Sequence, residues 1–319
     1  MKASFAAPAL DQPSPDAADV LAPGPLAADS AGRPTFFSDL SELVKLRLST
    51  LVVATTLIGF YLGWEGPLNV GLLLHALVGT ALAAAGASAL NQVWERTYDA
   101  TMRRTRNRPI PAGRMSAETG LILGCAFALT GLLYLACFTN LLAAVLAATT
   151  VAIYVFAYTP LKRVTTLNTL VGAVPGAIPP MIGWAVATGG VNYGAWLLFA
   201  LMFLWQMPHF LAIAWMYRDD YAQAGFVMLP GRDPAGFATG RQCVNYAFIT
   251  WIVGLLPSVV GLTSTGYLFA AFVVGLLFTV SAVRFQLDPC HARARQLFLA
   301  SILYLPLILA SLAIFKRHS

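Results

Sequence analysis

A short polar stretch in the first third of the chain carries residue types that suit a metal–diphosphate group. Asn91, Glu95 and Asp99 recur every four residues within NQVWERTYDATMRRTRNRPIP. On an α-helix each step of four residues turns only about 40° further and rises about 6 Å, so the three side chains share one face. Their oxygen atoms are suitable ligands for a hard cation such as Mg²⁺. We expect this stretch to form the active site.

Arginines are concentrated around this motif, and a guanidinium can bind two phosphate oxygens at once. Arg103, Arg104 and Arg108 are therefore predicted to bind a diphosphate. A solvated helix end with local ion pairs, or a simple topology signal, is the alternative. Polar groups at the end of an apolar span are costly and usually functional, which favours an active site. The surrounding arginines are Arg96, Arg103, Arg104, Arg106, Arg108 and Arg114.

A second polar stretch, residues 205–230, supplies further candidates. Asp219 and Asp220 could hold a second metal ion, although neighbours on a helix point about 100° apart, so one could instead pair with Arg218. His209 follows Pro208 inside an apolar segment. It could be a packing residue, or it could bind iron, hydrogen-bond a carboxylate or move a proton.

Two basic pairs lie at other ends of apolar segments: Lys162 with Arg163, and Lys45 with Arg47. Each pair alone is typical of interfacial anchoring. If the segment ends meet on one face of a bundle, the two pairs would join the arginines in a shared anion site. We expect them to bind the diphosphate.

The composition indicates a membrane protein. Of 319 residues, 58% are hydrophobic and 11% are charged, and the mean hydropathy is +0.70. Soluble domains carry about 25% charged residues. The net charge of +6 resides mainly in short loops, which favours lipid head groups over nucleic acid as the basic residues' partner. The four cysteines lack metal-site spacing, so neither a disulfide nor a cysteine metal site is expected.

The apolar segments predict an all-α fold with about nine transmembrane helices in residues 38–319, preceded by a disordered cytoplasmic tail at 1–37 without presequence character. Loops rich in charge alternate with loops that are nearly free of it. The positive-inside rule puts the charged loops and the N-terminus in the cytoplasm, and Lys316 and Arg317 at the outer C-terminus are exceptions to it. The predicted spans are 43–63, 69–90, 117–137, 140–158, 167–188, 194–215, 242–262, 265–284 and 295–315.

Over residues 38–315 the chain resembles UbiA-type intramembrane prenyltransferases. The Asn91–Glu95–Asp99 motif is similar to one shared across that superfamily. The segments WQMPHF (205–210) and DDYAQAGFVMLP (219–230) resemble the haem branch, the protohaem IX farnesyltransferases or haem O synthases. Two further segments contribute to the resemblance, MRRTRNRP (102–109) and YTPLKR (158–163).

The resemblance implies a helical bundle around a central cavity in a bacterial inner membrane. It implies Mg²⁺-dependent transfer of farnesyl from farnesyl diphosphate to a vinyl group of haem B, giving haem O, with a haem A synthase or oxidase assembly proteins as partners. Tyr217 and Tyr221 stand where many members have a second DxxxD motif. From the residues themselves we expect Asn91, Glu95, Asp99, Lys162, Arg163 and His209 to be catalytic. Expected metal ligands are Asn91, Glu95, Asp99, Asp219 and Asp220.

Aromatic side chains could shield an allylic cation through their π faces. Two other functions stay open at this stage: prenylation of an aromatic quinone precursor, and secondary transport. Transporters usually bind their substrate near the bilayer midplane, whereas the charged motifs here lie at predicted helix ends. The aromatic candidates are Tyr98, Tyr158, Trp205, Phe210 and Tyr221.

Overall fold

The structure, a computed structural model, describes residues 35–317 apart from the side chain of Arg47. The predicted tail at 1–37 lies almost wholly outside the described residues. A single compact unit comprises Phe37–Ser319. All the helices lie in this unit, except for the first residue of α1.

The all-α prediction is confirmed. Eight helices or continuous helix pairs are long and apolar enough to cross a membrane, and the bent pair α1–α2 gives a ninth. Each predicted span coincides with one of these segments. The helices are α1 (Phe36–Leu43), α2 (Leu46–Gly63), α3 (Val70–Asp99), α4 (Ala117–Phe138), α5 (Leu141–Ala152), the π-helix η2 (Ile153–Tyr158), α6 (Thr159–Leu161), α7 (Asn168–Ala177), α8 (Pro179–Thr188), α9 (Tyr193–Met216), α10 (Arg218–Gln223), the 3₁₀-helix η3 (Leu229–Arg232), α11 (Phe237–Val259), α12 (Thr265–Leu287) and α13 (His291–Ile314).

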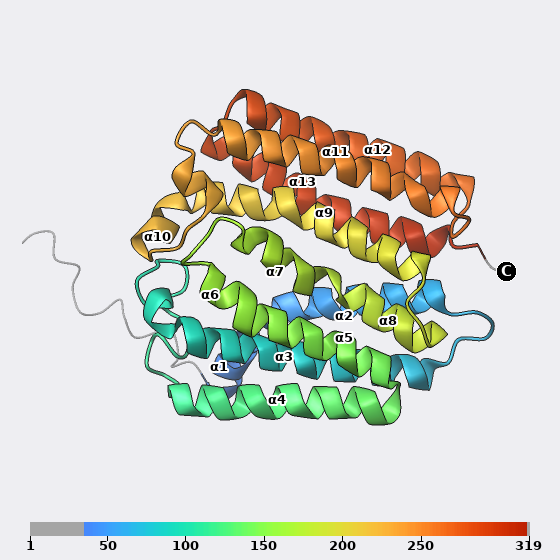
Figure 1. Cartoon of the computed structure of the whole chain (residues 1–319), viewed down its shortest axis with the longest axis horizontal. Helices are drawn as coiled ribbons and strands as arrows, with labels where there is room; N and C mark the ends of the chain where they lie inside the picture. The colour runs from blue at the N-terminus through green and yellow to red at the C-terminus, as the bar shows by residue number, and fades with distance from the viewer. Residues whose placement is uncertain (1–34, 318–319) are drawn as a thin grey trace, which may run out of the picture. The chain divides into compact units, whose positions relative to one another are not determined.

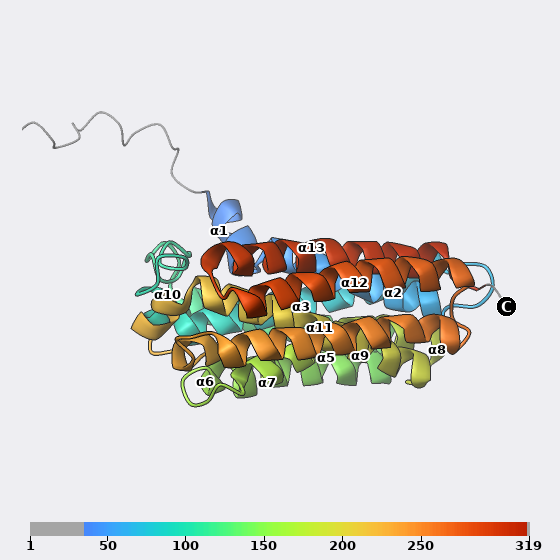
Figure 2. The same ribbon diagram turned by 90° about the horizontal axis from the view of Figure 1, so that it is seen from above.

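The long helices lie side by side, with their axes running along the same direction (Figures 1 and 2). Because successive spans run in opposite directions, the loops collect at two ends. We call one the charged end; it contains the loops at 100–116, 162–167, 217–236 and 288–290, on the left of Figure 1. The opposite end contains the loops at 64–69, 139–140, 189–192 and 260–264 and the C-terminal residues 315–317.

Short polar residues begin several of these helices. The side chains of Asn69, Ser116, Asn140 and Asn192 each accept a hydrogen bond from a backbone N–H in the first turn of α3, α4, α5 and α9. These caps satisfy donors that have no partner within the helix. In an apolar environment an unpaired N–H is costly, so the caps fix where each span starts.

Small residues allow the close packing of α2 against α8. A Cβ added to Gly59 would lie 1.9 Å from the carbonyl oxygen of Pro180, and one added to Gly183 would lie 1.9 Å from that of Thr56. Backbones can approach this closely only where side chains are absent, which is a common basis of helix packing in membranes. The two glycines therefore set the spacing of this helix pair.

The short helix α1 is attached to α3 by Gln92. The side-chain amide of Gln92 donates hydrogen bonds to the carbonyl oxygens of Glu42 and Leu43, each at 2.9 Å. Arg114, which was counted with the arginine cluster, forms ion pairs with Asp39 at 2.8 Å and Glu42 at 3.3 Å. These contacts hold α1 across the charged end and close it on that side.

Candidate active site

A cavity of about 220 Å³ opens at the charged end. We call it the acid–base cavity. It is bounded by the end of α3, by η2, by the beginning of α7 and by the end of α9, with the loop that follows α10. The lining includes Lys45, Asn91, Glu95, Asp99, Arg104, Arg108, Tyr154, Tyr158, Lys162, Asn168, Phe210 and Tyr221.

The four-residue motif has the expected geometry. Asn91, Glu95 and Asp99 lie in the last turns of α3, are 1%, 4% and 1% exposed, and all line the acid–base cavity. The helix continues beyond the predicted span, which ended at residue 90, up to Asp99. This extension keeps the three side chains on one continuous helical face.

Each member of the motif contacts a cation from another part of the chain. Asn91 Oδ1 accepts a 2.7 Å hydrogen bond from Lys45 Nζ. Glu95 Oε1 lies 2.6 Å from Lys162 Nζ, and Asp99 Oδ2 lies 2.6 Å from Arg108 Nη1. Asn91, Glu95 and Asp99 are thus each paired with one of the cations Lys45, Lys162 and Arg108 along one wall of the cavity. We call these three pairs the ladder. Buried charges of this kind are tolerated because they are paired.

One carboxylate oxygen in this ladder lacks a partner. Asp99 Oδ1 is buried and accepts no hydrogen bond among the described residues. The turn after α3 holds Asp99 in place, because Thr105 Oγ1 donates to the Asp99 carbonyl oxygen at 2.9 Å. Nowhere in residues 35–317 do three His, Cys, Asp or Glu side chains gather. A metal ion would therefore use two carboxylates and one amide, a donor set that suits Mg²⁺.

The two lysines reach the cavity from helix breaks. Lys45 lies between α1 and α2 and has φ 49°, a strained value for a non-glycine residue. Burial opposes the charge on Lys162, but Tyr158 and the Glu95 carboxylate outweigh it and raise the pKa of Lys162. Lys162 therefore stays cationic at neutral pH.

An aromatic wall faces the ladder. In the π-helix η2, Tyr154 and Tyr158 both line the cavity, with ring centroids 5.5 Å apart. Lys162 Nζ lies 4.5 Å from the Tyr158 ring centroid. Of the aromatic candidates, Tyr158, Phe210 and Tyr221 line this cavity. Tyr154 was missed, although its four-residue spacing from Tyr158 within YVFAY was a usable signal.

Two loops of the charged end are joined beside this wall. The backbone N–H of Val227 donates to the Lys162 carbonyl oxygen at 2.6 Å, and Asn168 Nδ2 donates to the Val227 carbonyl oxygen at 2.7 Å. The segment after α10 is thereby fastened to the loop that carries Lys162. This contact brings Phe226 and Met228, which sequence reasoning did not select, into the cavity lining.

The second acidic pair does not join the ladder. Asp219 and Asp220 line a neighbouring recess together with Arg103, and Arg104 lies between that recess and the acid–base cavity, which Tyr221 lines. The Asp219 side chain is 90% exposed and lies 3.9 Å from Arg218. α10 thus brings to the cavity a tyrosine from the position of the missing DxxxD motif. The expected grouping of five metal ligands is not present in this structure.

Other predicted residues also lie outside the cavity. Arg163 borders an adjacent recess, where its guanidinium donates to the Tyr98 hydroxyl at 2.5 Å. His209 packs against α13, with its Nδ1 2.8 Å from Ser301 Oγ and its ring stacked on Phe298. His209 is held away from the motif by α13. Arg163 is held by Tyr98 on α3, in a recess that Glu95 also lines, and bonds to the tyrosine rather than to the motif. Of the Lys45–Arg47 pair, only Lys45 has a described side chain.

Trp205, the remaining aromatic candidate, lies in the core. It is 5% exposed, and its indole N–H donates to the Ser301 carbonyl oxygen at 2.9 Å. Both Trp205 and His209 therefore connect α9 to α13. Within WQMPHF, only the last residue, Phe210, lines the acid–base cavity. The segment acts here mainly through packing.

Known proteins match most of this chain. Residues 52–305 match the model of the UbiA prenyltransferase family. A protoheme IX farnesyltransferase of Solibacter usitatus is 46% identical over 279 residues, which cover 85% of this chain and 96% of that protein. One of Koribacter versatilis is 42% identical over 296 residues, covering 90% and 96%.

Solved structures share the fold at low sequence identity. A digeranylgeranylglyceryl phosphate synthase has a TM-score of 0.74 at 15% identity, covering 88% of this chain and 98% of that one. A UbiA homologue from Archaeoglobus fulgidus bound to GPP and Mg²⁺ has a TM-score of 0.63 at 13% identity, covering 86% and 100%. The chain belongs to the UbiA prenyltransferase family, in the branch of the protoheme IX farnesyltransferases.

Proposed function

We propose that this protein transfers the farnesyl group of farnesyl diphosphate to a vinyl group of haem B and so makes haem O. The observation that carries the proposal is the ladder of the acid–base cavity, in which Asn91, Glu95 and Asp99 alternate with three cations. It lies beside an aromatic wall at the mouth of an apolar bundle. The names of the relatives at 42–46% identity support haem as the acceptor.

The motif on α3 would hold Mg²⁺, which in turn would offset the charge of the diphosphate. Asn91, Glu95 and Asp99 supply the oxygen donors, and the unpartnered Asp99 Oδ1 is a free position for this purpose. The structure of the Archaeoglobus homologue with GPP and Mg²⁺ supports a metal-dependent reaction. Asp219 and Asp220 line a neighbouring recess, so they could act as metal ligands only if α10 moved toward the acid–base cavity.

The three cations would exchange partners when substrate enters. Lys45, Lys162 and Arg108 contact the three motif residues in the free protein. With the motif oxygens holding a metal ion, Lys45, Lys162 and Arg108 would be free to turn to the phosphate oxygens. No charge is then left buried without a partner at any stage, which avoids a large penalty. The same cations stabilise the negative charge that develops on the leaving diphosphate.

The reaction breaks the bond between C1 of farnesyl and the diphosphate oxygen, and the electron pair leaves with the diphosphate. The terminal vinyl carbon of haem bonds to C1. Water adds to the adjacent carbon and releases one proton, so the products are haem O and diphosphate. The faces of Tyr154 and Tyr158 can stabilise the allylic cation by about 2 kcal/mol where water is excluded.

The chain would work in the bacterial inner membrane with the charged end in the cytoplasm, where farnesyl diphosphate is soluble. The positive charge of these loops supports that orientation. The product would pass to a haem A synthase or to oxidase assembly proteins. His209 and Arg163 would act indirectly, through their contacts with Ser301 and Tyr98.

A choice of acceptors tests the proposal. Purified protein in detergent receives farnesyl diphosphate and Mg²⁺ with an equimolar mixture of haem B and 4-hydroxybenzoate, and mass spectrometry follows both products. We expect farnesylated, hydrated haem and unmodified benzoate. Prenylated benzoate with intact haem would instead support a quinone-precursor enzyme. If folded protein modifies neither acceptor, the result would favour secondary transport over prenyl transfer.

A further inference from the structure

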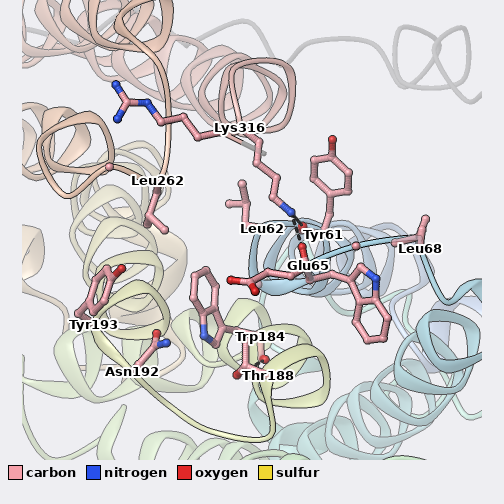
Figure 3. A pocket seen from close by; sticks show the side chains of 15 residues that line it. Tyr61, Leu62, Glu65, Leu68, Trp184, Thr188, Asn192, Tyr193, Leu262 and Lys316 are labelled. Carbon is pink, nitrogen blue, oxygen red and sulfur yellow. Dashed lines mark hydrogen bonds between the residues drawn. The ribbon is translucent and has the colours of Figure 1, made fainter. Parts of the chain in front are cut away.

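A second cavity lies at the opposite end of the bundle. It measures about 540 Å³ and is formed by the ends of α2 and α8, the start of α9, the loop between α11 and α12, and the C-terminal residues (Figure 3). We call it the outer cavity. It shares no lining residue with the acid–base cavity. Its charged and polar side chains include Glu65, Thr188, Asn192, Lys316 and Arg317.

Lys316 is fixed at the rim of the outer cavity. Its Nζ donates to the carbonyl oxygens of Tyr61 at 2.6 Å and Trp64 at 2.5 Å, at the C-terminal end of α2. The backbone around it is tied down by a bridge between Thr263 and Lys316. An ammonium has three donors, so one N–H remains beyond these two bonds. The ammonium is therefore anchored with one N–H left for another acceptor, which a ligand would share with or take from the nearby Glu65 carboxylate.

Trp184 presents a second donor without a partner. The side chain is 4% exposed, and its buried Nε1 makes no hydrogen bond among the described residues. Buried indole N–H groups normally find an acceptor. Trp64, for example, donates to the Pro67 carbonyl oxygen at 2.8 Å. Because Trp184 lines the outer cavity, a ligand that enters there could supply the missing acceptor once the side chains that cover Nε1 move aside.

The Trp184 ring cannot readily turn away. A Cβ added to Gly194 would lie 2.2 Å from the ring, and one added to Gly63 would lie 3.1 Å from it. The two glycines therefore hold the ring between α2 and α9. In Figure 3 its nitrogen lies on the side of Asn192, away from Lys316. The two donors thus serve different parts of one extended ligand.

The charge and position of the outer cavity indicate the ligand class. Two cations and one carboxylate line it, which favours an anionic group. Tyrosine and tryptophan around the opening, at Tyr61, Trp64 and Tyr193, are residue types enriched at the level of lipid head groups. A cavity of about 540 Å³ is much larger than a free phosphate ion requires.

We propose that the outer cavity binds the phosphate-bearing head group of one membrane phospholipid. The phosphate accepts the free N–H of Lys316, and the Trp184 N–H donates to an oxygen of the glycerol ester region. The acyl chains extend over the apolar rim, where Leu68 is 45% exposed. This lipid would attach the end of α2 to α8 and α9, at the end of the bundle away from the chemistry.

Native mass spectrometry of the full-length, delipidated protein tests the proposal, with phosphatidylethanolamine and phosphatidylglycerol as probes. We expect one retained lipid per chain. Trp184→Phe keeps the ring and removes the donor, so it should weaken binding about three- to tenfold. Trp251→Phe is the matched control, because Trp251 Nε1 is also buried without a partner but lies on α11 outside the cavity. Its lipid affinity should equal that of the wild type.

Two results would overturn the assignment. One is equal lipid retention by wild-type protein and Trp184→Phe, which would mean that the indole donor has no lipid acceptor. The other is displacement of the lipid by millimolar inorganic phosphate, which would identify the outer cavity as a site for free anions. A Lys316→Arg variant that retains lipid better than Lys316→Met would support the role of the cation.

Discussion

Lysine side chains at the two ends of the bundle have different kinds of partner. At the charged end, Lys45 and Lys162 contact the side-chain oxygens of Asn91 and Glu95. At the opposite end, Lys316 contacts main-chain carbonyl oxygens at the end of α2. Side-chain partners can be withdrawn and re-paired as substrate enters, whereas the carbonyls of a folded helix end stay in place. The ladder is thus suited to exchange, and Lys316 to anchoring.

The largest expected effect comes from removing a carboxylate of the ladder. Glu95→Gln keeps the size of the side chain and one acceptor oxygen, but it removes the negative charge that pairs with Lys162 at 2.6 Å. We expect kcat to fall about 10²–10³-fold, because the charged metal ligand and the ion pair to the lysine are both lost. Steady-state kinetics with haem B and farnesyl diphosphate measures this. If the variant keeps activity within tenfold of wild type, Glu95 is not an essential metal ligand.

Two adjacent cations provide a sharper comparison. Lys162 lies in the acid–base cavity, whereas Arg163 is held on Tyr98 in a neighbouring recess. Lys162→Met should lower kcat/KM about 10²-fold through lost stabilisation of the leaving group. Arg163→Met should stay within about threefold, the size of a surface interaction. Equal losses for both variants would contradict the assigned geometry.

The anchoring role of Lys316 predicts an effect on stability. Lys316→Met removes two hydrogen bonds from an ammonium to the carbonyl oxygens of Tyr61 and Trp64. We expect a loss of about 1.5–3 kcal/mol in unfolding free energy, since hydrogen bonds to charged groups are of this size. Thermal unfolding in detergent, with delipidated protein, measures the loss. An unchanged Tm would show that α2 does not depend on this contact.

The smallest expected effect concerns the second acidic pair. Asp219→Asn and Asp220→Asn should each keep at least about a third of wild-type activity, because both side chains line a recess outside the acid–base cavity. Surface charges of this kind contribute little. The same assay as for Glu95→Gln applies. A loss of 10²-fold in either variant would mean that α10 turns toward the ladder when substrate binds.

The sequence predicted the spans and the ladder's acidic side because these depend on local spacing. Apolar length identifies a transmembrane helix, and a four-residue repeat identifies one helical face. The helix that carries Asn91, Glu95 and Asp99 continues to Asp99, as the motif required. Both features need only the order of residues along one segment.

The pairing of the ladder and the positions of Asp220 and His209 depend on tertiary packing. Lys162 meets Glu95 across 67 positions of sequence, and Ser301 meets His209 across 92. Sequence spacing cannot show which of two adjacent residues turns inward. Asp220 and Tyr221 were both expected at the site, but only Tyr221 lines the acid–base cavity.

Binding of a non-reactive farnesyl diphosphate analogue, measured by calorimetry across a Mg²⁺ titration, tests the central claim most directly. The account predicts that wild-type protein binds the analogue only with Mg²⁺. Asp99→Asn should weaken this Mg²⁺-dependent binding at least about tenfold, and Asp219→Asn should leave it close to wild type. Two results would contradict the assignment of the α3 motif as the metal–diphosphate site. One is binding that does not depend on Mg²⁺, and the other is wild-type affinity in Asp99→Asn.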